Sequence, residues 1–172
     1  MQFCHSVWEA LSEMEFGRKD ILICAGGGVI CDMGGFIASI YKRGMNCMYI
    51  PTSLLGMVDA SLGGKTGVDL GSFKNQLGTF SFPSQVYIDS TFLQTLPEKE
   101  LLNGWSEMLK HGLVYSSNHF LSLSAGKTDM WTNELIQESL LIKSTIVEKD
   151  PFEKGERKLL NFGHTVGHAI EG

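Results

Sequence analysis

The chain has 172 residues, of which 19% are charged and 43% are hydrophobic, a composition that is typical of globular proteins and argues against disorder. Its formal net charge of -5 at pH 7 gives no general attraction to nucleic acid or to an anionic membrane surface. Any bound anion must therefore be held by a local site. Glycine is abundant, with 20 residues, and its clusters at residues 26–28, 34–35 and 63–64 indicate backbone that approaches a ligand.

The cysteines and the apolar stretches bear on the location of the protein. No Cys-x-x-Cys pair occurs among Cys4, Cys24, Cys31 and Cys47. We interpret the cysteines as reduced core residues, which favours an intracellular, cytoplasmic protein. The apolar stretch of residues 21–40 contains an aspartate and five glycines, so it does not predict a membrane helix. No signal peptide is predicted at the N-terminus, because no basic segment precedes an apolar one.

The first half of the chain predicts alternating helices and strands. Apolar residues at helical spacing predict an amphipathic helix over residues 1–14. The apolar run of residues 21–25 predicts a strand buried on both faces of a parallel sheet, and residues 29–41 predict the next helix. Further strands are expected at residues 46–50 and 86–89. This order is typical of an α/β sheet.

After Pro97 the pattern changes to helices, which are expected over residues 98–115, 133–150 and 157–172. No convincing strand separates them. We therefore predict a partial α/β domain over residues 1–95 and a partial helical domain over residues 96–172. No strand precedes the first helix and the last helix is unfinished, so we expect a piece of a longer protein.

The glycines at residues 26–28 follow a predicted strand and precede a predicted helix. Such a loop can hold a pyrophosphate, because glycine lets the backbone approach phosphate and a helix N-terminus offers unpaired N–H groups. The match to the dinucleotide-binding fingerprint is incomplete, since Cys31 stands at its third glycine. A tight turn explains the glycines equally well, and both interpretations stay open.

A second glycine loop, Gly63-Gly64-Lys65-Thr66, is similar to the end of a P-loop. Asp59 stands where that motif needs its first glycine, so a nucleoside triphosphatase is disfavoured. Lys65 is still a candidate anion-binding residue. The alternative is a solvated surface lysine.

Pairs of residues four apart place side chains on one side of a helix. His164 and His168 have the spacing of metal ligands or of an acid–base pair. The alternative is that both histidines have a structural role. No glutamate follows His164, so the zinc-protease motif is absent. Glu107 and His111 form a second such pair, and Glu107 shares a helix face with Lys110. Solvated side-chain pairing is the alternative explanation for this second group.

Lys143 falls on the apolar face of the helix predicted over residues 133–150, with Ile136, Leu140 and Val147. A lysine that turns inward needs an anionic partner. Alternatively, its stem lies along the apolar face and its ammonium group reaches water.

Five stretches, in this order, resemble the 3-dehydroquinate synthase family of sugar-phosphate cyclases. They are GGGVICDMGGFIASIYKRG (26–44), PTSLLGMVDASLGGKTGVDL (51–70), KNQLGTFSFP (74–83), TLPEKELLNGWSEMLKHGL (95–113) and RKLLNFGHTVGHAIE (157–171). The resemblance implies an α/β fold in which part of a Rossmann-like NAD-binding domain precedes an α-helical domain that binds metal and substrate. It places the active site in the cleft between them.

The resemblance also assigns roles to individual residues. The implied NAD contacts are Gly26, Gly27, Gly28, Asp32, Thr52, Ser53, Asp59, Lys65 and Lys74. Zn²⁺ or Co²⁺ would be held by Glu107 and His164, with a third ligand beyond residue 172. The implied catalytic and substrate-binding residues are Arg43, Asp59, Lys65, Asn75, Lys110, Lys143, Arg157, Asn161 and His168. Arg43 would reach across the interface of a homodimer, and His111 stands where the family has a tyrosine.

The implied reaction converts the phosphorylated sugar acid 3-deoxy-D-arabino-heptulosonate 7-phosphate to 3-dehydroquinate and phosphate, with NAD used catalytically. A related cyclase such as a deoxy-inosose synthase is the nearest alternative, but its substrate has no carboxylate for Lys143, Arg157 and Asn161 to bind. A polyol dehydrogenase of similar architecture and a folded, non-catalytic module are the others. Because the resemblance covers the middle half of the enzyme, we expect the isolated chain to be inactive.

Overall fold

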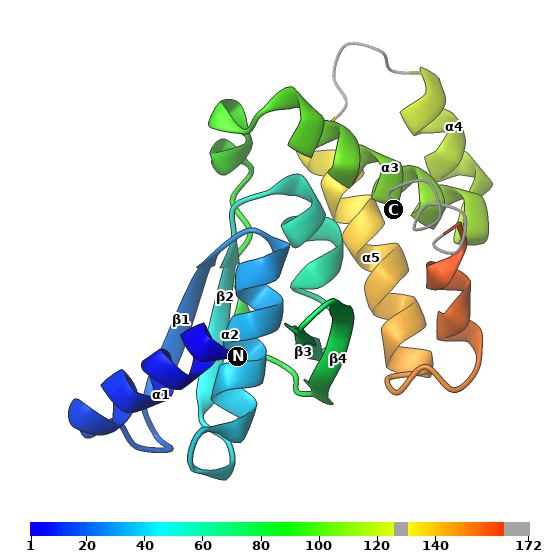
Figure 1. Cartoon of the computed structure of the whole chain (residues 1–172). Coiled ribbons are helices and arrows are strands. Elements are labelled where there is room, and N and C mark those ends of the chain that lie inside the picture. The colour runs from blue at the N-terminus through cyan, green and yellow to red at the C-terminus, as the bar shows by residue number, and fades with distance from the viewer. Residues whose placement is uncertain (126–130, 164–172) are drawn as a thin grey trace.

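The computed structural model describes residues 1–125 and 131–163 (Figure 1). Its first part contains α1 (Gln2–Glu13), β1 (Ile21–Gly26), α2 (Gly28–Ile40), the 3-10 helix η1 (Tyr41–Arg43) and β2 (Asn46–Pro51). The π-helical segment η2 (Gly56–Ala60), β3 (Lys65–Leu70), β4 (Phe73–Phe80), β5 (Gln85–Val86) and the 3-10 helix η3 (Ser90–Thr95) follow. The last part contains α3 (Glu98–Tyr115), α4 (Ser117–Ala125), α5 (Asn133–Lys149) and the 3-10 helix η4 (Glu156–Asn161). An α/β part is thus followed by helices, as predicted.

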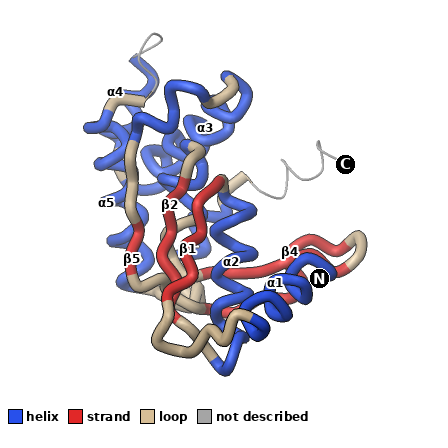
Figure 2. The backbone as a smooth tube through the Cα atoms, turned by 90° about the vertical axis from the view of Figure 1, so that its left-hand side faces the viewer, coloured by secondary structure: helices blue, strands red, loops and turns tan. Residues whose placement is uncertain are grey.

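Strands β1, β2 and β5 form a parallel sheet in the order β1-β2-β5 (Figure 2). The register pairs Ile21 with Asn46 and Gly26 with Pro51, so β1 and β2 end at the same edge. There the Thr52 N–H donates to the Gly26 carbonyl at 2.8 Å. Helix α2 provides the crossover that parallel neighbours require. The loops that follow β1 and β2 therefore lie side by side.

Burial on both faces of β1 is not observed in the described residues. Ile21 and Ile23 are 48% and 58% exposed, whereas Cys24 is buried. Cys24 lies against Gly34 of α2, where an added Cβ would overlap its Sγ atom. Helix α2 covers that face only, so an apolar run did not by itself predict two-sided burial. The strand expected at residues 86–89 is observed only as β5 (Gln85–Val86), so the two share Val86 alone.

Strands β3 and β4 form an antiparallel hairpin that the sequence analysis did not predict. Leu70 pairs with Phe73 across a two-residue loop, in which Gly71 has a φ of 60°. A Gly-Ser loop between alternating residues is a hairpin signal that would have found it. Because a strand follows Gly63 and Gly64, the loop does not have the helix that a P-loop requires.

Two groups of buried apolar side chains form the main cores. The first packs α1 and α2 on the sheet and contains all four cysteines, which are free and buried, as predicted. The second joins Leu54, Met57 and Val58 to α3, α4 and α5. Segment η2 contacts α2, α3 and α5, so it connects the two parts of the molecule.

The helices expected over residues 98–115 and 133–150 are confirmed as α3 and α5. The helix expected over residues 157–172 is only partly described, because η4 covers Glu156–Asn161 and residues 164–172 lie outside the described part of the chain. No helix within residues 1–125 and 131–163 is long and apolar enough to cross a membrane.

Candidate functional site

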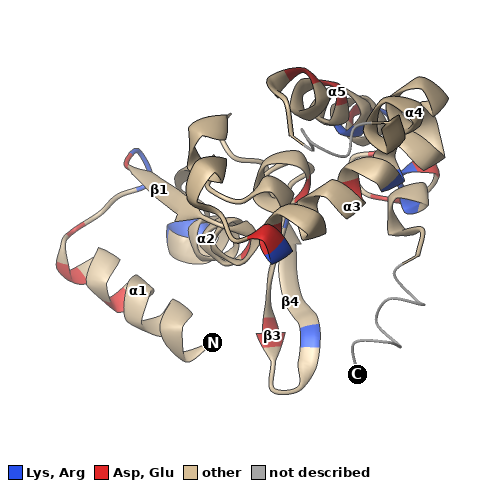
Figure 3. Ribbon diagram, turned by 90° about the horizontal axis from the view of Figure 1, so that it is seen from above, with Lys and Arg blue, Asp and Glu red and all other residues tan. Residues whose placement is uncertain are grey.

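A cavity of about 780 Å³ is lined by residues of α2, η2, the β3–β4 hairpin, α3, α5 and η4. Eight residues that the sequence analysis singled out line it: Asp32, Asp59, Lys65, Asn75, Lys110, Lys143, Arg157 and Asn161. Four of these eight are lysine or arginine, so the cavity can attract an anionic ligand although the whole chain is acidic. Acidic and basic positions also lie next to each other along α3 (Figure 3).

Lys143 and Asp59 form a partly buried ion pair between α5 and η2. The Lys143 Nζ atom donates to the Asp59 backbone carbonyl at 2.5 Å and also to its Oδ1 atom. The side chains are 6% and 35% exposed. Burial opposes ionisation of Asp59, but the ammonium group of Lys143 outweighs it and holds the pKa of Asp59 below its ordinary value. Of the two interpretations that the sequence left open for Lys143, the structure therefore shows the inward one, with Asp59 as the anionic partner.

Asp32 reaches the same cavity from α2. The pKa of Asp32 is raised to about 7, mainly by burial and also by the nearby Asp59 carboxylate, while Lys143 opposes this shift. A carboxyl group that titrates near neutral pH inside a cavity can hold or release a proton under physiological conditions.

Glu153 and Arg157 hold other residues of the cavity lining in place. Glu153 pairs with Lys65 and accepts a hydrogen bond from Asn161 Nδ2. Burial opposes ionisation of Glu153, but these two partners lower its pKa overall. The Arg157 guanidinium is buried and donates to the carbonyls of Pro151 at 2.6 Å and Gly63 at 2.8 Å. Arg157 thus holds main chain in place, and sequence reasoning missed Glu153 because no local pattern marks it.

Asn75 lines the cavity from the β3–β4 hairpin, whereas some other predicted residues do not line it. The Asn75 N–H donates to Asp69 Oδ1 at 2.6 Å on the hairpin. Lys74 on β4 and Arg43 at the end of η1 are exposed and do not line the cavity. His164 and His168 lie outside the described residues.

The first glycine loop forms the N-terminus of α2. Gly27 is the N-cap, and no side chain caps the helix. An added Cβ at Gly27 would lie 3.3 Å from Ser53 Oγ, so the loops after β1 and β2 touch. The uncapped N–H groups suit an anion such as a pyrophosphate. Gly26 also has a packing role, because a Cβ there would lie 2.6 Å from Ile30 Cγ1.

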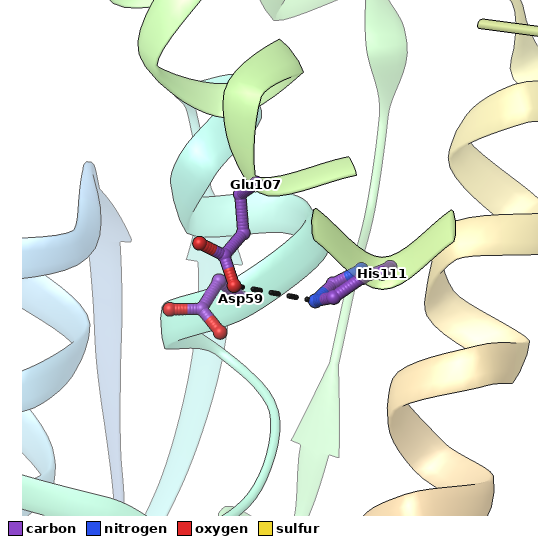
Figure 4. A group of neighbouring side chains, drawn as sticks. All are labelled: Asp59, Glu107 and His111. Atoms are coloured by element: carbon purple, nitrogen blue, oxygen red, sulfur yellow. Dashed lines mark ion pairs between the residues drawn. The ribbon is translucent and has the colours of Figure 1, made fainter. Parts of the chain in front are cut away.

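Asp59, Glu107 and His111 bring three potential metal-ligand atoms within 4.8 Å of one another (Figure 4). Glu107 Oε1 lies 3.3 Å from His111 Nε2 and 2.7 Å from Lys110 Nζ. Carboxylate and imidazole together suit Zn²⁺ or Co²⁺, so the donor set fits such an ion. Sequence reasoning noted the spacing of Glu107 and His111 but did not assign His111 to the metal.

Known families match the chain along its whole length. Residues 1–103 match the 3-dehydroquinate synthase N-terminal family, and residues 104–172 match the 3-dehydroquinate synthase C-terminal family. The chain is 45% identical over 169 residues to the 3-dehydroquinate synthase of Parabacteroides distasonis, a match that covers 96% of this chain and 48% of that protein. It is 46% identical over 167 residues to that of Pyrococcus furiosus, with 96% and 50% covered.

A solved structure shares the fold. ValA, the 2-epi-5-epi-valiolone synthase of Streptomyces hygroscopicus with NAD⁺ and Zn²⁺ bound, has a TM-score of 0.90 and 32% identity. The match covers 99% of this chain and 50% of that one. The chain spans about half the length of the curated relatives it matches. Because the two family matches together cover residues 1–172, this chain belongs to the 3-dehydroquinate synthase family.

Proposed function

We propose that this chain carries a substrate-binding site of a 3-dehydroquinate synthase, which converts 3-deoxy-D-arabino-heptulosonate 7-phosphate to 3-dehydroquinate and phosphate. The observation that carries the proposal is that Lys65, Lys110 and Lys143 all line the same cavity. A phosphorylated sugar acid has a phosphate and a carboxylate, and charge-assisted hydrogen bonds from ammonium groups suit both. Family membership supports the same substrate class.

The proposal includes NAD and a divalent cation, Zn²⁺ or Co²⁺. NAD would contact the glycine loop at residues 26–28 and the adjoining Thr52 and Ser53, with Asp32, Asp59, Lys65 and Lys74 as further contacts. Glu107 and His164 would hold the cation. When bound, NAD supplies a reversible hydride acceptor and the cation polarises a substrate hydroxyl. The uncapped N-terminus of α2 and the buried Glu107 Oε1 atom support these two sites.

The chain's own residues bind and orient the substrate. Lys143 is held in position by Asp59 before substrate arrives, so little side-chain freedom is lost on binding. Arg157 holds the Gly63 carbonyl at 2.8 Å and thereby places the loop that leads into Lys65. Holding both anionic ends of one substrate keeps its intermediates in a reactive geometry through several steps.

Further residues complete the proposed site. Asn75 and Asn161 offer amide groups at the cavity wall, Lys110 a further ammonium group, and Asp32 a proton-exchanging carboxyl group. His168 would relay a proton beside the substrate. In a homodimer, which is part of the proposal, the exposed Arg43 would reach the partner's substrate. The four free thiols support a cytoplasmic location.

The test uses a chimaera in which this chain replaces its counterpart in the Parabacteroides distasonis enzyme. Phosphate release and NADH absorbance are followed together, with substrate in large excess over NAD⁺. We expect phosphate to rise far past the NAD⁺ supplied while NADH absorbance stays flat, because each turnover reduces and reoxidises the cofactor. Stoichiometric NADH without phosphate would instead indicate a polyol dehydrogenase. Equal turnover of a sugar phosphate without a carboxylate would indicate another sugar-phosphate cyclase.

A further inference from the structure

The α5–η4 loop (residues 150–155) is held in shape by one of its own carboxylates (Figure 1). Asp150 accepts three backbone N–H groups, from Lys154 at 2.8 Å, Gly155 at 2.7 Å and Arg157 at 3.1 Å. Within the loop Glu153 has a φ of 55°, in the left-handed region that is unfavourable for a residue other than glycine. Such a conformation persists only where surrounding contacts hold it. The contacts of the loop tip are therefore part of what keeps this loop in place.

Two side chains of the α5–η4 loop contact the β3–β4 hairpin. Glu153 forms an ion pair with Lys65. The ring of Phe152 packs edge-on against Phe80, with ring centroids 5.5 Å apart and an angle of 73° between the planes. Lys65 and Phe80 stand directly opposite each other in the pairing of β3 with β4. The ion pair and the ring contact therefore join the same loop to the same end of the hairpin.

An anionic ligand affects these two contacts differently. Lys65 and Phe80 both line the cavity. A phosphate or carboxylate that binds Lys65 competes with Glu153 for its ammonium group and weakens the ion pair. The contact between two uncharged rings is not subject to this competition. It can therefore hold the loop after the ion pair has been given up.

The exposure of the two rings argues for a local role. Phe80 is 46% exposed and Phe152 is 54% exposed, and neither belongs to the two main cores. Their contact is thus separate from the packing that holds the whole molecule together. An aromatic pair of this geometry adds a stabilisation that corresponds to roughly 2- to 10-fold in an equilibrium constant.

We propose that Phe80 and Phe152 are positioning residues. Their ring contact holds the α5–η4 loop against the hairpin while Lys65 exchanges Glu153 for an anionic group of the substrate. A loop that is already in place does not have to be ordered when the substrate binds, so the contact favours binding. The inference deepens the proposed function and rests on it for the identity of the substrate.

Limited trypsin cleavage of the 172-residue chain measures how often the loop leaves the hairpin. Lys154 is exposed in the loop, and cleavage after it follows the open population when opening is fast. Phe152→Ala and Phe80→Ala should each raise this cleavage rate roughly 2- to 10-fold. The double variant should be no faster than either single variant, because the same contact is lost in all three. Unchanged single variants, or increases that multiply in the double variant, would overturn the inference.

Other sites in the chain provide matched controls. Phe73 lies on the same strand as Phe80, is 65% exposed and takes part in no aromatic ring contact within the described residues, so Phe73→Ala should leave cleavage after Lys154 unchanged. Phe152→Tyr keeps the ring and should behave like the unchanged chain. Arg18 is exposed in the loop between α1 and β1, far along the chain from the α5–η4 loop. A parallel rise in cleavage after Arg18 would indicate global unfolding and would overturn the inference.

Lys65→Met removes the ion pair, as competition by an anion would. It should raise cleavage after Lys154 by a factor of its own, because the ion pair is a separate contact. Combined with Phe152→Ala, it should give the product of the two separate increases. If Phe152→Ala adds nothing in the Lys65→Met chain, the rings do not hold the loop once the ion pair is lost, and the inference fails.

Kinetics of the chimaera test the positioning role itself. Phe152→Ala should raise the KM for the phosphorylated sugar acid roughly 2- to 10-fold and change kcat by less than about twofold, because the contact acts on binding and not on the chemical steps. Phe152→Tyr should restore the KM. A KM that is unchanged in Phe152→Ala would overturn the positioning role. Phosphate release by the chimaera without these substitutions decides the proposed function separately.

Discussion

Replacing Lys143 by methionine removes the positive charge from its ion pair with Asp59 and keeps most of the side-chain length. In the folded protein Lys143 Nζ donates to both the backbone carbonyl and the carboxylate of Asp59. Breaking a fully buried pair from one side costs about 3–5 kcal/mol. Because the Asp59 side chain is 35% exposed, water offsets part of this, and we expect Lys143→Met to lower the free energy of unfolding by about 2–3 kcal/mol at neutral pH.

The pH dependence of this effect has a definite direction. Lys143 lowers the pKa of Asp59 in the folded state relative to the ordinary value of 3.8. The stabilisation is therefore fully present above that value and is lost as the pH falls through the folded-state pKa. The difference between wild type and Lys143→Met should shrink in acid, where Asp59 is protonated in both proteins.

Urea unfolding of wild type, Lys143→Met, Asp59→Asn and the double variant measures the pairwise term directly. We expect a coupling energy of about 2 kcal/mol. A coupling below about 0.5 kcal/mol would refute the assignment, since distant or independent sites give that result. In the chimaera, Lys143→Met should also weaken substrate binding tens-fold, because a charge-assisted hydrogen bond contributes roughly 1.5–3 kcal/mol. Unchanged kinetics would limit Lys143 to a structural role.

Two further predictions concern α2. Gly35→Ala should lower the free energy of unfolding by about 3 kcal/mol, because the added Cβ would overlap Tyr49 Oη and Thr66 Cγ2. Tyr49→Phe should restore part of that loss in urea unfolding, and no loss in the single variant would contradict the packing. Asp32→Asn should remove a pH dependence of the folding stability. The pKa of Asp32 is about 7 in the folded state against an ordinary value of 3.8, so the folded state binds more protons between these two values. Wild-type stability therefore falls as the pH rises through this range. Thermal unfolding should show the variant more stable by at most about 4 kcal/mol at about pH 8 and equal to wild type near about pH 3, whereas parallel pH curves would exclude a raised pKa.

Local patterns in the sequence predicted much of the secondary structure. Apolar spacing placed a helix over residues 133–150, close to the observed Asn133–Lys149, and put Lys143 on its inward side. Both follow from the fixed period of a helix, which needs no information about the rest of the molecule. The glycine loop before α2 was predicted from its cluster of glycines between a predicted strand and a predicted helix. The hairpin also had a local signal, at Gly71 and Ser72, that was not used.

Only the tertiary structure decided which distant residues meet. Lys143 and Asp59 are 84 residues apart in the chain, and no local pattern pairs them. The spacing of Glu107 and His111 is visible in one helix, but the contact of His111 Nδ1 with Ser139 Oγ depends on the packing of α5. The exposure of Ile21 likewise depends on which face of the sheet α2 covers. Side-chain periodicity is set by the backbone of a single element, whereas these contacts depend on how whole elements pack against one another.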